Sequence, residues 1–194
     1  MTSSQVTCTC FDQGGPQNTA ETLAIAQERA RQLDIKDILI ATTSGETGAL
    51  AAELMPDRHV VAVTHSTGFA APNEQQLEDQ HRDRILAAGA EILTCQHAFG
   101  GVGRAVRRKL GTYQIDEIIA FTLRLFCDGL KVACEITLMA ADAGLVRAGD
   151  PVIAVGGSAS GADTAALIRA ANAQDLFDLR VLEVLCKPRG YPAS

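Results

Sequence analysis

The chain has 194 residues, of which 47% are hydrophobic and 21% are charged. This length suits one well-buried domain and is short for two, so we expect a single domain over residues 1–194. The net charge of −6 argues against nucleic acid or an anionic membrane surface as the main partner. The apolar runs are strand-sized and the N-terminus lacks a signal-peptide pattern, which makes a cytoplasmic location the default expectation.

Short runs of β-branched and apolar residues alternate along the chain with segments of helical periodicity. The expected strands lie at residues 6–11, 37–42, 59–64, 90–95, 151–156 and 181–187. Helices are expected at residues 19–33, 47–54 and 74–88, with two or three more between residues 104 and 144. This alternation is typical of an α/β fold in which helices cover both faces of a parallel or mostly parallel sheet.

Ligands of such sheets bind at the carboxyl ends of the strands. Four strand ends here are rich in Gly, Ser, Thr or Asn: CFDQGGPQNT from residue 10, TTSGETG from residue 42, THSTGF from residue 64 and GGSASGADT from residue 156. Because parallel strands end at one edge of a sheet, we expect these four loops to converge. Their convergence is the main functional signal that the residues themselves give.

The loop TTSGETG places hydroxyl side chains and two glycines just before a helix. Backbone amides at a helix N-terminus carry partial positive charge and can donate hydrogen bonds to a phosphate. Gly45 and Gly48 would let the backbone approach such a ligand closely. The alternative is that Ser44 or Thr43 only caps the helix and satisfies a free amide.

The segment GGSASGADT has the G-x-x-x-x-G spacing of a P-loop, at Gly156 and Gly161. Ala162 and Asp163 stand where a P-loop has Lys and Ser or Thr, which argues against a nucleoside triphosphate site of that type. We expect Asp163 to accept hydrogen bonds from backbone amides or from ligand hydroxyls. The six cysteines lack the paired spacing and nearby histidines of a zinc site, so no metal site is expected.

No complete set of nucleophile, base and acid can be assembled, so the sequence leaves open whether the protein is an enzyme. His65 follows a strand and is the best-placed histidine for acid–base work, although a structural role is equally compatible with its position. Glu135 and Asp142 are seven residues apart on one predicted helix, where Lys131 can pair with Glu135 at the i,i+4 spacing. Asp142 has no such partner and is the second catalytic candidate.

Arg104, Arg107, Arg108 and Lys109 form a basic cluster in an otherwise acidic protein. Their spacing puts the three arginines on one helix face, where they could meet a phosphate or a carboxylate. A solvated helix face or a subunit contact is the more common role of such a cluster, and the sequence favours that interpretation.

Two blocks of the sequence resemble the C-terminal domain of pyruvate kinase: TTSGETGALAAELMPDRHVVAVTH and AADAGLVRAGDPVIAVGG. The closer resemblance is to the stand-alone pyruvate kinase C-terminal-domain-like family, whose pattern is echoed by NTAETL, THSTGF, RRKLG, GLKVACEITLMAADAG, AVGGSASGADTA and EVLCKPR. This resemblance implies a three-layer α/β/α sandwich. It also implies a mostly parallel, five-stranded sheet in the order 3-2-1-4-5, with the last strand antiparallel.

The resemblance also implies a ligand. In pyruvate kinase this domain binds a sugar-phosphate effector, whose phosphate lies in the loop that corresponds to residues 42–47. For the stand-alone family the implied ligand is flavin mononucleotide (FMN), which would give the protein an oxidoreductase role. Its phosphate would lie on residues 43–48, its ribityl hydroxyls near Ser158 and Asp163, and its ring against Phe69 or Phe99. The alternatives are a non-enzymatic sensor of a phosphorylated metabolite and an enzyme that acts on a phosphorylated small molecule.

Glu46 departs from the hydroxyl or basic residue usual at its position in pyruvate kinase, so its side chain is expected to point away from a bound monophosphate. The resemblance further implies a homo-oligomer. The expected ligand contacts are Thr42, Thr43, Ser44, Gly45, Thr47, Gly48, His65, Thr67, Gly68, Phe69, Gly156, Gly157, Ser158 and Asp163.

Overall fold

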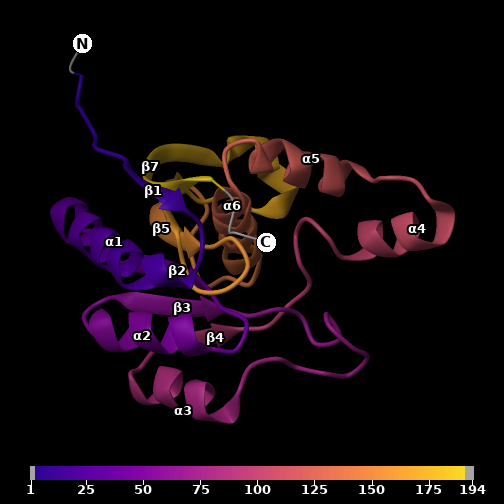
Figure 1. Ribbon diagram of the computed structural model, residues 1–194, viewed down its shortest axis with the longest axis horizontal. Coiled ribbons are helices and arrows are strands. Elements are labelled where there is room, and N and C mark those ends of the chain that lie inside the picture. The colour runs from indigo at the N-terminus through magenta and orange to yellow at the C-terminus, as the bar shows by residue number, and fades with distance from the viewer. Residues whose placement is uncertain (1–2, 191–194) are drawn as a thin grey trace.

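A seven-stranded sheet forms the centre of the molecule in the computed structural model, which describes residues 3–190 (Figure 1). Its strands are β1 (Thr9–Gln13), β2 (Asp37–Ala41), β3 (His59–Val63), β4 (Glu91–Leu93), β5 (Pro151–Gly156), β6 (Thr164–Arg169) and β7 (Arg180–Gly190). Their order is β1-β7-β6-β5-β2-β3-β4. Within the described residues, β6 alone runs antiparallel to its neighbours, β5 and β7.

Helices pack on both faces of this sheet. They are α1 (Thr19–Leu33), α2 (Glu46–Leu54), α3 (Asp79–Ala87), α4 (Val102–Leu110), α5 (Ile115–Arg124) and α6 (Asp128–Asp142), with short 3-10 helices η1 (Pro16–Asn18) and η2 (Ala173–Asp178). The helix expected at residues 74–88 begins later than predicted, at Asp79, because residues 74–78 belong to the loop that follows β3. No helix within residues 3–190 is long and apolar enough to cross a membrane.

The alternation of side chains along the strands explains the three layers. Ile38 and Ile40 of β2 belong to the core under α1, α2 and α3, whereas Leu39 between them belongs to the core under α5 and α6. Accordingly, α1 and α2 lie on the opposite side of the sheet from α6 (Figure 1). The predicted α/β/α class is therefore confirmed.

The predicted strand order is present, but the predicted number of strands is wrong. The neighbours β4-β3-β2-β5-β6 read 3-2-1-4-5 when β2 is counted first, and the last of them is antiparallel. Beyond β6 the sheet continues with β7 and β1, the strands expected at residues 181–187 and 6–11. The strand that the sequence did not predict is β6, because Ala165 and Ala166 give a weak strand signal directly after a glycine-rich loop.

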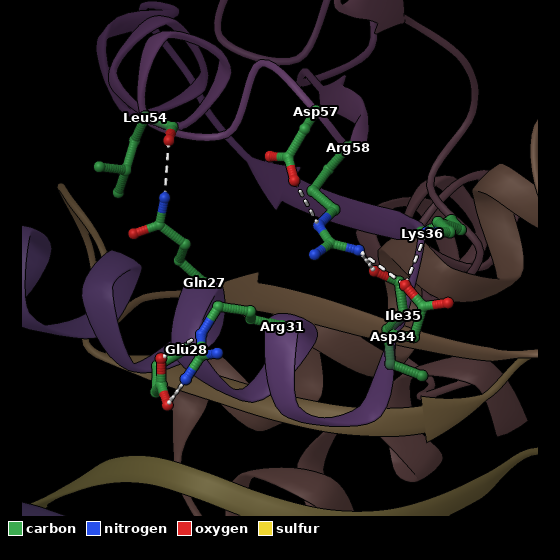
Figure 2. A network of polar contacts seen from close by, with 9 residues as sticks. All are labelled: Gln27, Glu28, Arg31, Asp34, Ile35, Lys36, Leu54, Asp57 and Arg58. Atoms are coloured by element: carbon green, nitrogen blue, oxygen red, sulfur yellow. Dashed lines mark hydrogen bonds and ion pairs between the residues drawn. The ribbon is translucent and has the colours of Figure 1, made fainter.

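A polar network closes one edge of the sheet, at the amino ends of β2 and β3 (Figure 2). Arg58 donates to the carbonyl of Ile35 over 3.1 Å and pairs with Asp34, the C-cap residue of α1. Gln27 of α1 donates to the carbonyl of Leu54, the last residue of α2. These contacts hold the turn before β2 against the turn before β3. The loops at the other edge of the sheet, at the carboxyl ends of the strands, provide the candidate site.

Candidate functional site

A cavity of about 460 Å³ lies at the carboxyl ends of β2, β3 and β5, within the usual size range of small-molecule sites. Its walls come from the loops after β2, β3 and β5, from His97 after β4, from Arg104 of α4, Arg124 of α5 and one face of α6. Three of the four predicted loops therefore converge. The fourth, after β1, lies beside the loop after β5, because the amide of Gly15 bonds to the side chain of Asp163, but it does not line the cavity.

The loop after β2 is held in shape by its own residues. The hydroxyl of Thr42 accepts hydrogen bonds from the amide of Gly45, over 3.1 Å, and from that of Gly48, over 3.5 Å. Gly45 has a φ of 100°, and a Cβ added there would lie 2.6 Å from Leu77 and 2.7 Å from His81. Only glycine fits this position, so Gly45 determines the shape of the loop. Gly45 is not among the residues that line the cavity.

The same loop has unused hydrogen-bond donors in residues that line the cavity. Thr43, Ser44 and Thr47 line it, and their amides donate to no acceptor among the described residues. They stand at the N-terminus of α2, where the helix dipole adds positive potential. Glu46 is also among the lining residues. The arrangement suits an anion that accepts hydrogen bonds from backbone amides and hydroxyls.

A second wall carries a buried pair of opposite charges on α6. The side chains of Lys131 and Glu135 are 7% and 4% exposed and form the ion pair that their spacing predicted. Burial lowers the pKa of Lys131, and its pairing with Glu135 offsets only part of this. Burial by itself would raise the pKa of Glu135, but the His97 ring and the Lys131 ammonium outweigh it and lower that pKa to about 2. Glu135 is therefore ionised at neutral pH, and Lys131 is its counter-charge.

Three rings lie together at the cavity. The centroid of Phe69 is 4.0 Å from that of His65 and 5.0 Å from that of His97, and the Cζ of Arg104 lies 4.9 Å from the Phe69 centroid. The Nδ1 of His65 donates to the amide oxygen of Gln76 over 2.8 Å, which leaves Nε2 of the neutral ring as an acceptor. Burial is the main cause that lowers the pKa of His65, so its ring is neutral at pH 7.

The family of this chain follows from its sequence. Residues 20–169 match the family described as "Pyruvate kinase, alpha/beta domain". The chain belongs to this family. The match begins in α1 and ends with β6, so it contains five strands, β2 to β6, in the order that the resemblance implied, whereas β1 and β7 lie outside it.

Solved structures of pyruvate kinase are similar to this pyruvate kinase alpha/beta domain. A pyruvate kinase from Cryptosporidium parvum is 18% identical, with a TM-score of 0.40, over 78% of this chain and 22% of that enzyme. The pyruvate kinase of the same organism in complex with ADP gives the same identity and TM-score over 78% of this chain and 23% of that enzyme. The chain thus spans less than a quarter of the length of these enzymes.

Half of the contacts predicted for this pyruvate kinase alpha/beta domain line the cavity: Thr42, Thr43, Ser44, Thr47, His65, Phe69 and Gly157. The other half do not: Gly45, Gly48, Thr67, Gly68, Gly156, Ser158 and Asp163. The glycines in the second group mostly relieve crowding. A Cβ on Gly48 would lie 3.0 Å from that of Ala62, and one on Gly156 would lie 2.5 Å from the carbonyl oxygen of Gly129.

Asp163 is fully buried and bonded within the protein. Its carboxylate accepts hydrogen bonds from the amides of Gly15 (3.0 Å) and Ser158 (3.1 Å) and from the hydroxyl of Thr164 (2.8 Å). The predicted acceptance from backbone amides is therefore confirmed, whereas the structure leaves Asp163 away from the cavity wall.

Asp142 also lies away from the cavity and from His65. Its carboxylate accepts hydrogen bonds from the side chain of Asn172 and from the amide of Ala173, both over 3.0 Å, and it thereby caps the N-terminus of η2. The two catalytic candidates of the sequence are therefore not brought together, and Asp142 has a structural contact of its own.

Sequence reasoning did not select eight polar residues of the cavity wall as ligand contacts: Glu46, Thr64, His97, Arg104, Arg124, Lys131, Glu135 and Ser160. A signal for Lys131 and Glu135 was present, since they are charged residues in the middle of a mostly apolar helix whose other charges, Asp128 and Asp142, stand at its two ends. Buried charges of this kind mark functional sites. His97 had no such signal, because its loop carries no motif.

Proposed function

We propose that this chain binds a phosphorylated small molecule in the 460 Å³ cavity, with the phosphate on the loop after β2. The observation that carries the proposal is that the amides of Thr43, Ser44 and Thr47 have no acceptor within the described chain although they stand at the N-terminus of α2 and their residues line the cavity. A phosphate would satisfy these donors and would interact favourably with the helix dipole.

Within this class, the ligand that we propose is FMN. The amide loop suits its phosphate, and the rings of His65, Phe69 and His97 suit contact with a planar group. Ser160, in the loop after β5, lines the cavity, whereas Ser158 and Asp163 do not, so we propose Ser160 as the contact of the ribityl chain. Bound flavin would supply hydride-transfer chemistry, which is the basis of a proposed oxidoreductase role.

Backbone strain in the loop after β5 also supports a ligand here. Ala159 lines the cavity and has a φ of 133°, a conformation that residues other than glycine rarely adopt. Such strain is concentrated at ligand sites, where the surrounding structure holds it in place.

The experiment that tests the proposal is native mass spectrometry of freshly purified protein, combined with its absorption spectrum. We expect a bound mass that corresponds to a phosphorylated molecule, and flavin absorption bands if that molecule is FMN. Protein that is colourless and carries no bound mass, and whose melting temperature is unchanged by FMN, sugar phosphates or nucleotides, would overturn the proposal.

A second candidate function is an enzyme that acts on a phosphorylated small molecule, with His65 as the proton-transfer group. It is favoured by the neutral ring of His65, which lines the cavity and whose Nε2 has no hydrogen-bond partner within residues 3–190 and can accept a proton. If His65→Ala kept full turnover on a substrate identified by screening, His65 would lose this role. A ligand that binds without turnover would favour a non-enzymatic sensor instead.

We also propose that the chain is a homo-oligomer that associates through α5. Tyr113, Ile118, Phe121 and Leu125 are exposed and form one apolar surface. Such a surface on a C2 dimer meets its own copy, and burying it would remove apolar area from water. Light scattering tests this: we expect Leu125→Asp to give a smaller species than the wild type, and a monomeric wild type would contradict it.

A further inference from the structure

A second cavity, of about 340 Å³, lies between α4, α5 and α6. It shares Arg104, Arg124 and Lys131 with the first cavity, so the two adjoin. Its remaining walls include Arg107, Arg108 and Glu117. The basic cluster that the sequence singled out therefore borders a cavity, with the exception of Lys109, which is exposed and does not line it.

The cations of this second cavity outnumber the carboxylates that pair with them. Arg107 pairs with Glu117 over 2.6 Å, Arg124 pairs with Asp128 over 3.0 Å, and Lys131 pairs with Glu135. Arg104 and Arg108 form no ion pair with a carboxylate in the described part of the chain.

Bringing these positive groups together is unfavourable unless an anion joins them. The planar guanidinium fork is the side chain best suited to bind a carboxylate or a phosphate in two parallel hydrogen bonds. The second cavity is therefore built to receive an anion.

Glu117 gives a second, independent sign of a ligand. Its side chain is 8% exposed, and its Oε1 accepts a hydrogen bond from Arg107. Its Oε2 is buried and has no hydrogen-bond partner among the described residues. A buried carboxylate oxygen without a donor is unfavourable. Because Glu117 lines the second cavity, a small rotation of its side chain would let a ligand hydroxyl or ammonium group donate to this oxygen and satisfy it.

We infer that the second cavity is an anion-binding site for a small molecule in which a carboxylate or a phosphate stands next to a hydroxyl or ammonium group. Arg104 and Arg108 hold the anionic group, and Glu117 accepts the hydrogen bond of the neighbouring donor. Because Arg104 borders both cavities, this anion lies beside the ligand proposed for the first cavity, and it is a separate occupant of the site. The inference does not depend on which phosphorylated molecule fills the first cavity.

Calorimetric titration with inorganic phosphate, which carries both an anionic charge and a hydroxyl, tests the two sites separately. We expect the wild type to bind two phosphates per chain. Arg108→Gln should bind one, whereas Lys109→Gln, which removes a neighbouring charge outside the cavity, should bind two. Ser44→Asp should also bind one, because its negative charge blocks the loop after β2.

The outcomes separate this inference from the proposed function. A wild type that binds one phosphate, lost in Ser44→Asp and kept in Arg108→Gln, overturns the second site and leaves the proposed function in place. A wild type that binds one phosphate, which Arg108→Gln no longer binds and Ser44→Asp still binds, overturns the proposed phosphate position and supports the second site. No binding at millimolar phosphate overturns both.

The role of Glu117 is tested with lactate and propionate, which differ by one hydroxyl group. We expect lactate to bind the wild type roughly tenfold more tightly, as one added hydrogen bond to a buried acceptor gives. Equal affinities would overturn the part of the inference that concerns the neighbouring donor.

Discussion

The carboxylate of Glu135 accepts a hydrogen bond from the backbone amide of Phe99 over 2.9 Å, although the two residues are 36 positions apart in the sequence. This bond ties α6 to the loop after β4. The same carboxylate pairs with Lys131 and lies 3.7 Å from the ring of His97. The buried carboxylate of Glu135 thus holds together a cavity wall that the sequence did not predict.

Replacing Glu135 by glutamine should strongly destabilise the fold. The substitution leaves the Lys131 ammonium buried without a counter-charge, and breaking a buried pair in this way lowers the free energy of unfolding by about 3 kcal/mol or more. Urea denaturation at pH 7 measures the change. The control is Glu28→Gln, which breaks the exposed pair with Arg31 and should change stability far less, because water screens an exposed ion pair. Similar losses in the two variants would contradict the role of Glu135.

The stability that Glu135 contributes should disappear at acid pH. Although burial opposes it, the pKa of this carboxyl is lowered to about 2 by His97 and Lys131, from an ordinary value near 4.5. Its contribution is therefore complete above the unfolded-state pKa and is lost as the pH falls from about 4.5 toward 2. Denaturation of wild type and Glu135→Gln between pH 7 and 2.5 should show their difference shrinking over that window. A difference that is constant with pH would contradict the lowered pKa.

His59 should stabilise the sheet more at pH 6 than at pH 8.5. It lies between Asp37 of β2 and Glu91 of β4, with ring nitrogens 2.7 Å and 3.1 Å from their carboxylates. Burial lowers its pKa, but the two carboxylates together outweigh this and raise it. The stabilisation is complete below the unfolded-state pKa of about 6.5 and is lost as the pH rises through the higher folded-state value. The melting-temperature difference between wild type and His59→Gln should fall across this range; an increase would show that the sign is wrong.

Asp163→Ala should unfold more readily even without a ligand. The variant leaves the amides of Gly15 and Ser158 and the hydroxyl of Thr164 without their acceptor in the protein interior. Losses of this kind lower the free energy of unfolding by about 3 kcal/mol in total. Asp163→Asn keeps one acceptor oxygen, so its melting temperature should lie between those of the wild type and Asp163→Ala. A variant with wild-type stability that had lost only ligand affinity would instead support the original expectation that Asp163 contacts the ligand.

The sequence predicted those parts of the site that local patterns determine. The end of β2 and the start of α2 can be recognised from the sequence around the loop that joins them. Thr43, Ser44 and Thr47 of this segment do line the cavity. The glycines were harder to interpret, because a glycine needed for close packing, such as Gly48 against Ala62, has the same sequence pattern as one needed for a ligand.

The remaining wall could not be predicted because it depends on how distant helices pack. Arg104 and Arg124 belong to α4 and α5, and nothing in their local sequence indicates that they meet at one cavity. The strand β6 was missed for a related reason. It is stabilised by pairing with β5 and β7 on both sides, and this compensates for alanines that have little strand preference of their own.

The proposal that a phosphate binds to the loop after β2 is tested most directly by the affinity for FMN of the wild type, Ser44→Asn and Ser44→Asp. The two substitutions have the same shape and differ in charge, and Ser44 avoids the crowding that would strain any substitution at Gly45. In fluorescence titrations we expect the wild type and Ser44→Asn to bind FMN with similar affinity and Ser44→Asp to bind at least tenfold more weakly, while riboflavin, which lacks the phosphate, binds all three alike. Equal FMN affinity in all three proteins would contradict the phosphate position, and no FMN binding to the wild type would contradict FMN as the ligand.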